Sequence, residues 1–446
     1  MSRRTSFIAA VVTCACVALC LSPLSARQAG GPQPAITEFD VNGLKVLVKQ
    51  RAGSQTVAGA LFIRGGSRNI TAENAGIEDL MLDVATEASA NFPRDRFRRE
   101  LARTGTVISS GVGYDYSGFT IGCTRQYFDS AWTLFTDAAL RPSFAADDFE
   151  RVKNQNLIGL SGAEDTPDAF LQTLQAKVIY AGHPYLNEPH GTIESVKRLT
   201  VADMRRYHQQ MMQTSRLLLV LVGDLDPQQV KAKVATSFGA LPRGAYVPSA
   251  APPLSFSEPT VSVTAKELPT NYVQGVYAAP PLTSPDYDAM RVATSILHDR
   301  IFEEVRQKRA LSYAPDASLG SQGANIGDIY VTAVDANRAV QVMLAEITRL
   351  KTTDVSPDDI QAIAQQFLTN YYVGQETNAA QAGTLAQAEM IGGGWRTSSA
   401  FIDRVRAVTP ADVRRVAGAY LKNIQFVVLG NPASIDKKIF LQPPGS

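Results

Sequence analysis

The sequence predicts an α+β fold made of two duplicated halves, each a mostly antiparallel sheet covered by helices on one face. Residues 199–206 match residues 408–415, and in both segments a threonine precedes a helix start with aspartate at its third position. Each helix leads to an apolar strand closed by glycine, at residues 217–222 and 425–429. The threonines are 209 residues apart and the glycines 207. Nearly equal offsets at two landmarks indicate one architecture used twice.

Within each half, the predicted strands precede long helices. An Asn-Gly turn introduces an alternating strand at residues 44–48, and further strands are expected at 57–63 and 272–278. Apolar residues at helical spacing predict a helix over residues 75–88. Further helices are expected at residues 149–160, 169–179, 288–309, 359–371 and 379–391.

Length and composition favour two domains. The chain has 446 residues, and domains usually contain about 100–200. A proline-rich, weakly charged linker at residues 244–258 separates an N-terminal domain (36–243) from a C-terminal domain (259–440). The formal net charge is +1 and no basic run stands out, which argues against a nucleic-acid partner.

The first 26 residues have the pattern of a cleaved signal peptide. Two arginines precede an apolar run at residues 7–21, and small residues follow at 24–26. We therefore expect a periplasmic or secreted protein with no stable membrane anchor after cleavage; an uncleaved N-terminal anchor is the alternative. Three of the four cysteines lie in this segment. The remaining Cys123 lies in a strand-like stretch, and we interpret it as a buried apolar residue rather than a nucleophile.

The histidines do not form a recognisable metal site. The chain has His183, His190, His208 and His298, with no two at helical i, i+4 spacing and no H-E-x-x-H or H-x-x-E-H string. His183 and His190 share a loop but lack a clear third ligand, so local hydrogen bonds are the preferred interpretation. The glycines at 392–394 are interpreted as a turn.

An ordered series of segments resembles the pitrilysin/insulinase family of zinc peptidases. In the first half the matching stretches lie at residues 41–48, 65–68, 74–77, 165–167, 183–185, 191–195 and 222–224, and the resemblance as a whole covers nearly all of the mature chain, both halves included. The family carries H-x-x-E-H directly after the A-G-[LI] step, where the histidines bind zinc and the glutamate activates water. Here Asp79 and Asp83 stand at the two histidine positions and Leu82 at the glutamate. Counting back from residues 165–167 places Gly159 at the family's third ligand, so all four positions are degenerate.

The degenerate positions predict a chain that binds no cofactor itself. Leu82 cannot accept a proton, so water activation is lost. Asp79 and Asp83 are four residues apart and can share one helix face. A solvated acidic face is the preferred interpretation, and a weak oxygen-only site for a hard cation is the alternative.

A second motif is retained in the C-terminal half. Residues 302–313 resemble the family segment L-x-x-x-[VLI]-R-E-x-x-G-L-[AS]-Y, with Arg306 and Tyr313 at its arginine and tyrosine. The resemblance implies that both residues bind the substrate carbonyl oxygen and stabilise the tetrahedral intermediate, a role that suits a guanidinium and a phenol. A surface arginine and a tyrosine at the edge of the core are the structural alternative. The family's glycine is replaced by Ala310, which puts the local loop conformation in question.

The resemblance, together with the degenerate zinc positions, implies the noncatalytic subunit of a periplasmic zinc metallopeptidase heterodimer. The resemblance implies clamshell halves, a homologous zinc-bearing partner and a peptide substrate, with Arg306 and Tyr313 supplied in trans. A homodimer is the other assembly to consider. A structural or peptide-binding scaffold with no role in hydrolysis is the alternative function. An independent metal-dependent hydrolase using Asp79 and Asp83 is the third reading.

Overall fold

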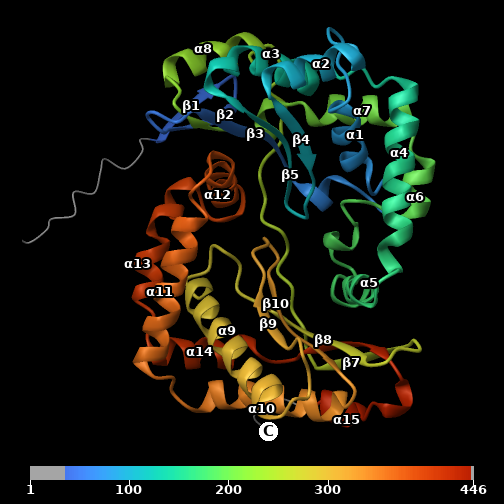
Figure 1. Cartoon of the computed structure of the whole chain (residues 1–446), viewed down its shortest axis with the longest axis vertical. Coiled ribbons are helices and arrows are strands. Elements are labelled where there is room, and N and C mark those ends of the chain that lie inside the picture. Colours follow the sequence, from blue (N-terminus) through green and yellow to red (C-terminus); the bar gives the residue numbers. More distant parts are fainter. Residues whose placement is uncertain (1–35, 443–446) are drawn as a thin grey trace, which may run out of the picture.

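The computed structural model describes residues 36–442 (Figure 1). Its N-terminal half contains a six-stranded sheet in the order β1-β2-β6-β3-β5-β4. The strands are β1 (Ile36–Val41), β2 (Leu44–Gln50), β3 (Thr56–Arg64), β4 (Val107–Gly111), β5 (Tyr116–Thr124) and β6 (Leu217–Gly223). The helices are α1 (Ile77–Ala85), α2 (Arg94–Thr104), α3 (Phe128–Leu140), α4 (Ala146–Ser161), α5 (Pro167–Ile179), α6 (Ile193–Arg198), α7 (Val201–Met211) and α8 (Pro227–Phe238).

The C-terminal half contains a five-stranded sheet in the order β7-β11-β8-β10-β9. The strands are β7 (Thr260–Ala265), β8 (Asn271–Ala278), β9 (Asp316–Leu319), β10 (Ile326–Ala333) and β11 (Gln425–Gly430). The helices are α9 (Tyr287–Ile301), α10 (Ala336–Thr352), α11 (Pro357–Val373), α12 (Asn378–Ile391), α13 (Phe401–Arg406), α14 (Pro410–Tyr420) and α15 (Lys437–Phe440).

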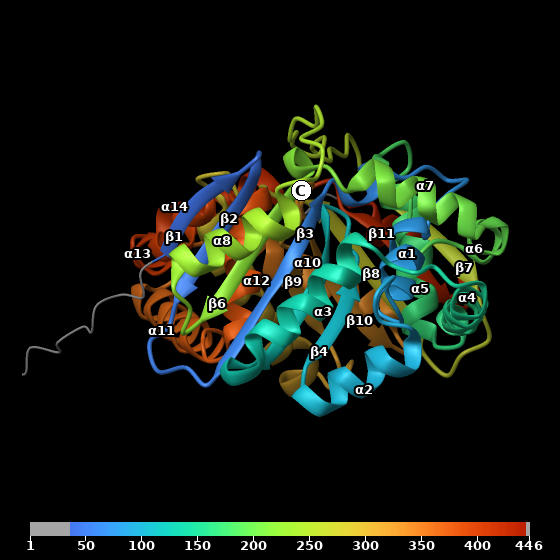
Figure 2. The ribbon, with the colours of Figure 1, turned by 90° about the horizontal axis from the view of Figure 1, so that it is seen from above.

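Apart from the additional edge strand β1, the two sheets have the same topology, which confirms the predicted duplication. In each sheet one pair is parallel, β2 with β6 and β7 with β11, and every other pair is antiparallel. The repeated helix starts are α7 and α14, where Thr200 and Thr409 each form a capping box with the aspartate three residues later. Helices such as α3 and α8 cover the outer face of the first sheet (Figure 2).

One helix of each half packs on the inner face of the other half's sheet (Figure 1). Helix α12 packs on β3 and β6, where Ala382 and Leu385 meet Phe62 and Leu218. In return, α5 packs on β8 and β11 through Leu171. The Lys45 ammonium is 2.7 Å from a Glu389 carboxylate oxygen across the first of these contacts. This exchange interlocks the halves through apolar burial as well as charge.

Three local predictions can be compared with the structure. The helix predicted at residues 288–309 is α-helical only to Ile301 and continues as a π-helical segment, η6 (Phe302–Lys308). Cys123 is buried in the core of the N-terminal half, and burial raises the pKa of its thiol to about 11, which fits the predicted apolar role. The predicted signal peptide, residues 1–26, lies outside the described residues. Within residues 36–442 no helix is both long and apolar enough to span a membrane.

Candidate functional site

Helix α1 carries the three degenerate motif positions, and they face different surroundings. Leu82, at the position of the family's catalytic base, is 3% exposed and belongs to the apolar core of the N-terminal half. Its neighbours around a small enclosed space include Leu61, Met81 and Phe119. A proton acceptor is therefore missing, and the space that it would need is occupied by hydrocarbon.

The two aspartates of α1 are held by separate sets of partners. An oxygen of Asp79 is 2.9 Å from Nδ1 of His190, which corrects the expectation of purely local bonds for that loop histidine. The hydrogen bond to Asp79 raises the pKa of His190. Asp83 accepts a hydrogen bond from Ser110 Oγ at 2.6 Å, and burial raises the pKa of its carboxyl group. His183 bonds both locally and at long range: its Nδ1 accepts from the Tyr185 amide at 3.1 Å, and its Nε2 is 2.9 Å from the Pro252 carbonyl oxygen of the linker.

Helix α4 supplies the position equivalent to the third metal ligand. Gly159 is exposed and has open space where a side chain would begin. One turn earlier, Asn156 donates to Asp83 through Nδ2 at 3.3 Å. Within residues 36–442 no group of three or more histidine, cysteine or carboxylate side chains could hold a metal ion. Two carboxylates already bonded to an imidazole, a hydroxyl and an amide do not fit a tight zinc site.

Glu78 was missed by the sequence reasoning, although it adjoins Asp79. Its side chain is buried and accepts hydrogen bonds from the hydroxyls of Ser117 and Tyr207. Burial raises the pKa of this carboxyl group. The sequence offers little signal for it, because Glu78 and Asp79 both lie in the first turn of α1, where acidic residues are ordinary.

Arg306 and Tyr313 come together on the segment that follows α9, residues 302–313, which we call the arm. The guanidinium carbon of Arg306 is 4.1 Å from the ring centre of Tyr313 and 4.8 Å from that of Phe302. Tyr313 is 79% exposed, so it is not the residue at the edge of the core that the structural alternative assumed. Across the described part of the chain, no ion pair or hydrogen bond is formed by the Arg306 guanidinium.

The neighbouring cations on the same arm are paired. Lys308 is 2.7 Å from Glu304 and 2.9 Å from Glu303, and Arg309 also contacts Glu304. The lack of a carboxylate partner therefore distinguishes Arg306 from nearby residues of equal charge.

The arm turns at Ala310, which has a φ of 51°. This is the left-handed conformation that glycine adopts easily and alanine adopts at a cost. The turn is closed by a hydrogen bond from the Leu311 amide to the Val305 carbonyl at 2.9 Å. The loop thus has a glycine-type backbone despite the substitution.

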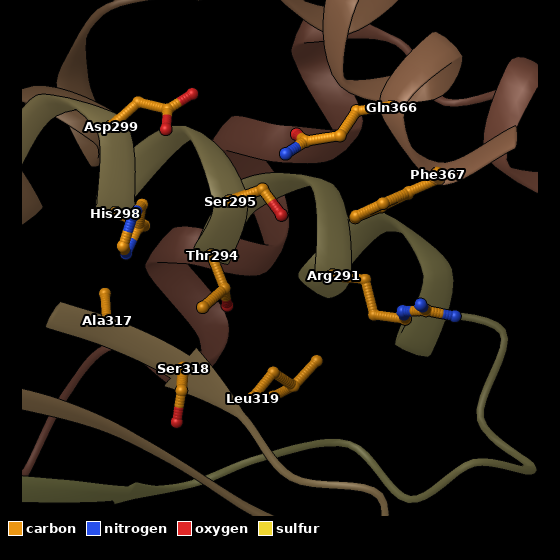
Figure 3. A pocket seen from close by; sticks show the side chains of 10 residues that line it. All are labelled: Arg291, Thr294, Ser295, His298, Asp299, Ala317, Ser318, Leu319, Gln366 and Phe367. Atoms are coloured by element: carbon orange, nitrogen blue, oxygen red, sulfur yellow. The ribbon is translucent and has the colours of Figure 1, made fainter. Parts of the chain in front are cut away.

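His298 lies on α9 and contacts the arm. Its Nδ1 is 2.7 Å from Asp316 on β9, and its ring stacks on Phe302 with 6.2 Å between centres. His298 and Ala317 line a cavity of about 200 Å³ between α9, β9 and α11 (Figure 3). A hydrogen bond and ring contacts thus connect β9 to Arg306 by way of His298 and Phe302.

Two family models match most of the described chain. Residues 45–188 match "Insulinase (Peptidase family M16)", and residues 198–367 match "Peptidase M16 inactive domain". The chain belongs to the M16 family. The second match begins in the N-terminal half and continues into the C-terminal half, so the two matches together include parts of both halves.

Some relatives of this chain have names that describe a peptidase, and others have names that do not. The "non-peptidase homolog YmxG" of Helicobacter pylori is 23% identical over 47% of this chain and 49% of its own length. Subunit 1 of the bovine cytochrome b-c1 complex is 23% identical over 60% and 55%. The "uncharacterized zinc protease ML0855" of Mycobacterium leprae is 20% identical over 88% and 91%. This chain thus spans about half the length of the first two relatives and nearly all of the third.

Solved M16 structures have the same fold. A protease from Helicobacter pylori superposes with a TM-score of 0.82 at 18% identity, over 90% of this chain and 100% of that one. A "peptidase M16 inactive domain" from Pseudomonas fluorescens gives 0.81 at 18% identity, over 89% and 98%. With Leu82 in place of the catalytic base, this chain is a noncatalytic M16 protein of the pitrilysin-like type.

Proposed function

We propose that this chain is the noncatalytic subunit of a zinc metallopeptidase and presents Arg306 and Tyr313 to a peptide held by a homologous, zinc-bearing partner. The observation that carries the proposal is the state of Arg306. Two aromatic rings hold its guanidinium in place, and no described residue uses its hydrogen-bond donors. A preorganised cation without a partner is suited to an acceptor that arrives from outside the chain.

The chemistry of the pair suits the stabilisation of an oxyanion. A guanidinium remains charged at all physiological pH values and offers several donors in a fixed plane. The hydroxyl of an exposed tyrosine adds a directional donor beside it. Together they would bind the oxygen that becomes negative when zinc-activated water attacks a peptide carbonyl, while the partner supplies the metal and the base.

The position of the arm supports action in trans. The described residues contain no hydrogen bond, ion pair or ring contact between the Arg306/Tyr313 pair and the residues of α1. A partner's zinc helix would therefore be the site that this arm serves. The predicted signal peptide extends the proposal to a periplasmic or secreted complex.

The test is peptide hydrolysis by this chain, by a zinc-bearing M16 chain from the same genome, and by their mixture. We expect activity only in the mixture. Arg306→Ala/Tyr313→Phe should lower kcat/KM of the mixture by about 10²-fold or more, because oxyanion donors contribute on that scale. Arg309→Ala is the matched control, since Arg309 lies on the same arm but is already paired with Glu304.

A scaffold or peptide-binding role without hydrolysis is the second candidate. It is favoured by the relatives named as a non-peptidase homologue and as a respiratory-complex subunit. In that case the zinc-bearing chain would be equally active alone, or the double variant would be as active as the wild type. Either result would overturn the proposed subunit role.

A further inference from the structure

A second cavity lies in the C-terminal half, beside the one drawn in Figure 3. It has a volume of about 300 Å³ and forms where α9, α11, α12 and the start of α13 meet. Arg291 and Phe367 line both cavities. In Figure 3 the Arg291 side chain extends away from His298, so its charged end lies at the far side of the smaller cavity.

The charges of the larger cavity do not cancel. Its lining contains two guanidiniums, Arg291 and Arg404, and one carboxylate, Asp288. Arg404 is hydrogen-bonded through Nε to Asp288, and its Nη1 donates to the Thr397 carbonyl at 3.2 Å. The charges of Arg404 and Asp288 offset each other, although the second Asp288 oxygen, Oδ1, has no hydrogen-bond partner among the described residues. Arg291 is then the lining cation without an ion pair.

Arg291 is surrounded by rings instead of carboxylates. Its guanidinium carbon is 4.4 Å from the ring centre of Phe401, 4.9 Å from Phe367 and 5.9 Å from Tyr287. In the part of the chain that the structure describes, this guanidinium makes no ion pair or hydrogen bond. The aromatic contacts position the guanidinium but leave its donors available.

We propose that this cavity binds a small organic carboxylate with an aromatic or aliphatic body. The carboxylate would pair with Arg291, because a guanidinium matches two carboxylate oxygens with parallel hydrogen bonds. The body would lie against the rings of Phe367, Tyr371 and Phe401. The volume is at the lower end of ordinary small-molecule sites, and the surplus of one positive charge favours a monoanion. This site is independent of the Arg306 arm.

A ligand there would act on the contact between the halves. Helix α12 lines the cavity through Thr384, Gln387 and Ala388. The same helix packs Ala382 and Leu385 on the sheet of the N-terminal half. A bound carboxylate is therefore expected to hold α12 in its docked position and to slow its local opening.

The carboxylate is tested by titrating the full chain with three probes. These are 3-phenylpropionate as a free acid, N-acetyl-phenylalanine as a mimic of a peptide C-terminus, and the neutral N-acetyl-phenylalanine amide. Calorimetry or NMR should give saturable binding of at least one acid, with the amide at least tenfold weaker. The stronger acid identifies the source, a free acid or a peptide end. Hydrogen exchange of the α12 amides should slow when the acid is bound.

Variants of Arg291 complete the test. Arg291→Gln should weaken acid binding at least tenfold, and Arg291→Lys should bind with intermediate strength because it keeps the charge but loses the two-pronged geometry. Arg338→Gln removes the same charge from an exposed position on α10 and should leave the affinity within about twofold. Far-UV circular dichroism checks the fold of each variant. Equal binding of acid and amide, unchanged binding by Arg291→Gln, or no saturation by about 10 mM of either acid would overturn the proposal.

Discussion

The two halves have the same topology but treat their functional side chains in opposite ways. In the N-terminal half the degenerate motif has turned inward, with Leu82 in the core, Asp79 on His190 and Asp83 on Ser110. In the C-terminal half the equivalent helix, α9, leads to an arm whose Arg306 and Tyr313 face outward. The polar side chains at the predicted motif positions are thus bonded within the N-terminal half, whereas the donors of Arg306 in the C-terminal half remain open.

This difference shows how a duplicated fold can divide its roles. A carboxylate at a position where the family has a histidine would carry an unbalanced charge unless a neighbour donates to it, and His190, Ser110 and Asn156 do so here. Arg306 shows the reverse arrangement, because its guanidinium is held in place without an ion pair or hydrogen bond to a described residue. Ring contacts provide that placement for Arg306.

The largest effect is expected from placing a glutamate at position 82 of the N-terminal half, the predicted position of the catalytic base. Leu82→Glu should reduce the free energy of unfolding by at least about 3 kcal/mol, because a carboxyl group would replace hydrocarbon in a packed core. Leu82→Met keeps the volume and should cost less than about 1.5 kcal/mol. Urea unfolding of both variants measures the difference. A Leu82→Glu protein as stable as the wild type would mean that this half has not closed over its former site.

A smaller, pH-dependent effect is expected at Glu78. Burial raises the pKa of its carboxyl group, so the folded chain binds this proton more tightly than the unfolded chain. Its contribution to stability is full below the ordinary pKa of 4.5 and is lost as the pH rises through the raised folded value. Each pH unit within that window corresponds to about 1.4 kcal/mol. Glu78→Gln should remove this loss in urea titrations between pH 4 and 8.

Glu150→Gln on the exposed face of α4 is the control for Glu78. It should leave the slope of stability against pH unchanged. Equal slopes for wild type and Glu78→Gln would mean that the Ser117 and Tyr207 hydroxyls stabilise the ionised carboxylate enough to offset its burial.

The periodic features of this fold could be predicted from sequence, and the long-range contacts could not. The duplication was predicted because Thr200 and Thr409 are separated by nearly the same number of residues as the glycines that end the two following strands. Helix caps and apolar strands can be recognised from short stretches of sequence. The exchange of α5 and α12 between the halves could not be predicted, because the sequence of a helix does not say which of two sheets it will cover.

The same distinction holds for the candidate site: its motif positions could be predicted from the sequence, and its long-range contacts could not. The positions of Asp79, Leu82 and Arg306 could be read from a motif. The partnership of Asp79 with His190 joins residues 111 apart and depends on how a loop folds back on α1. The π-helical turn at Arg306 was missed for a related reason, since its sequence continues an ordinary helical pattern.

The smallest effect tests whether the open arm retains backbone strain. Ala310 has a positive φ, which costs about 1–2 kcal/mol for an L-residue, whereas glycine costs about 0.5–1 kcal/mol of unfolded-state entropy. Ala310→Gly should therefore stabilise the chain by about 0.5–1 kcal/mol in thermal or urea unfolding. The same change at Ala362, exposed within α11, should destabilise it by about 1 kcal/mol. Opposite signs would locate the strain at the turn that carries Arg306 toward Tyr313, and equal losses would mean that the arm is relaxed with alanine in place.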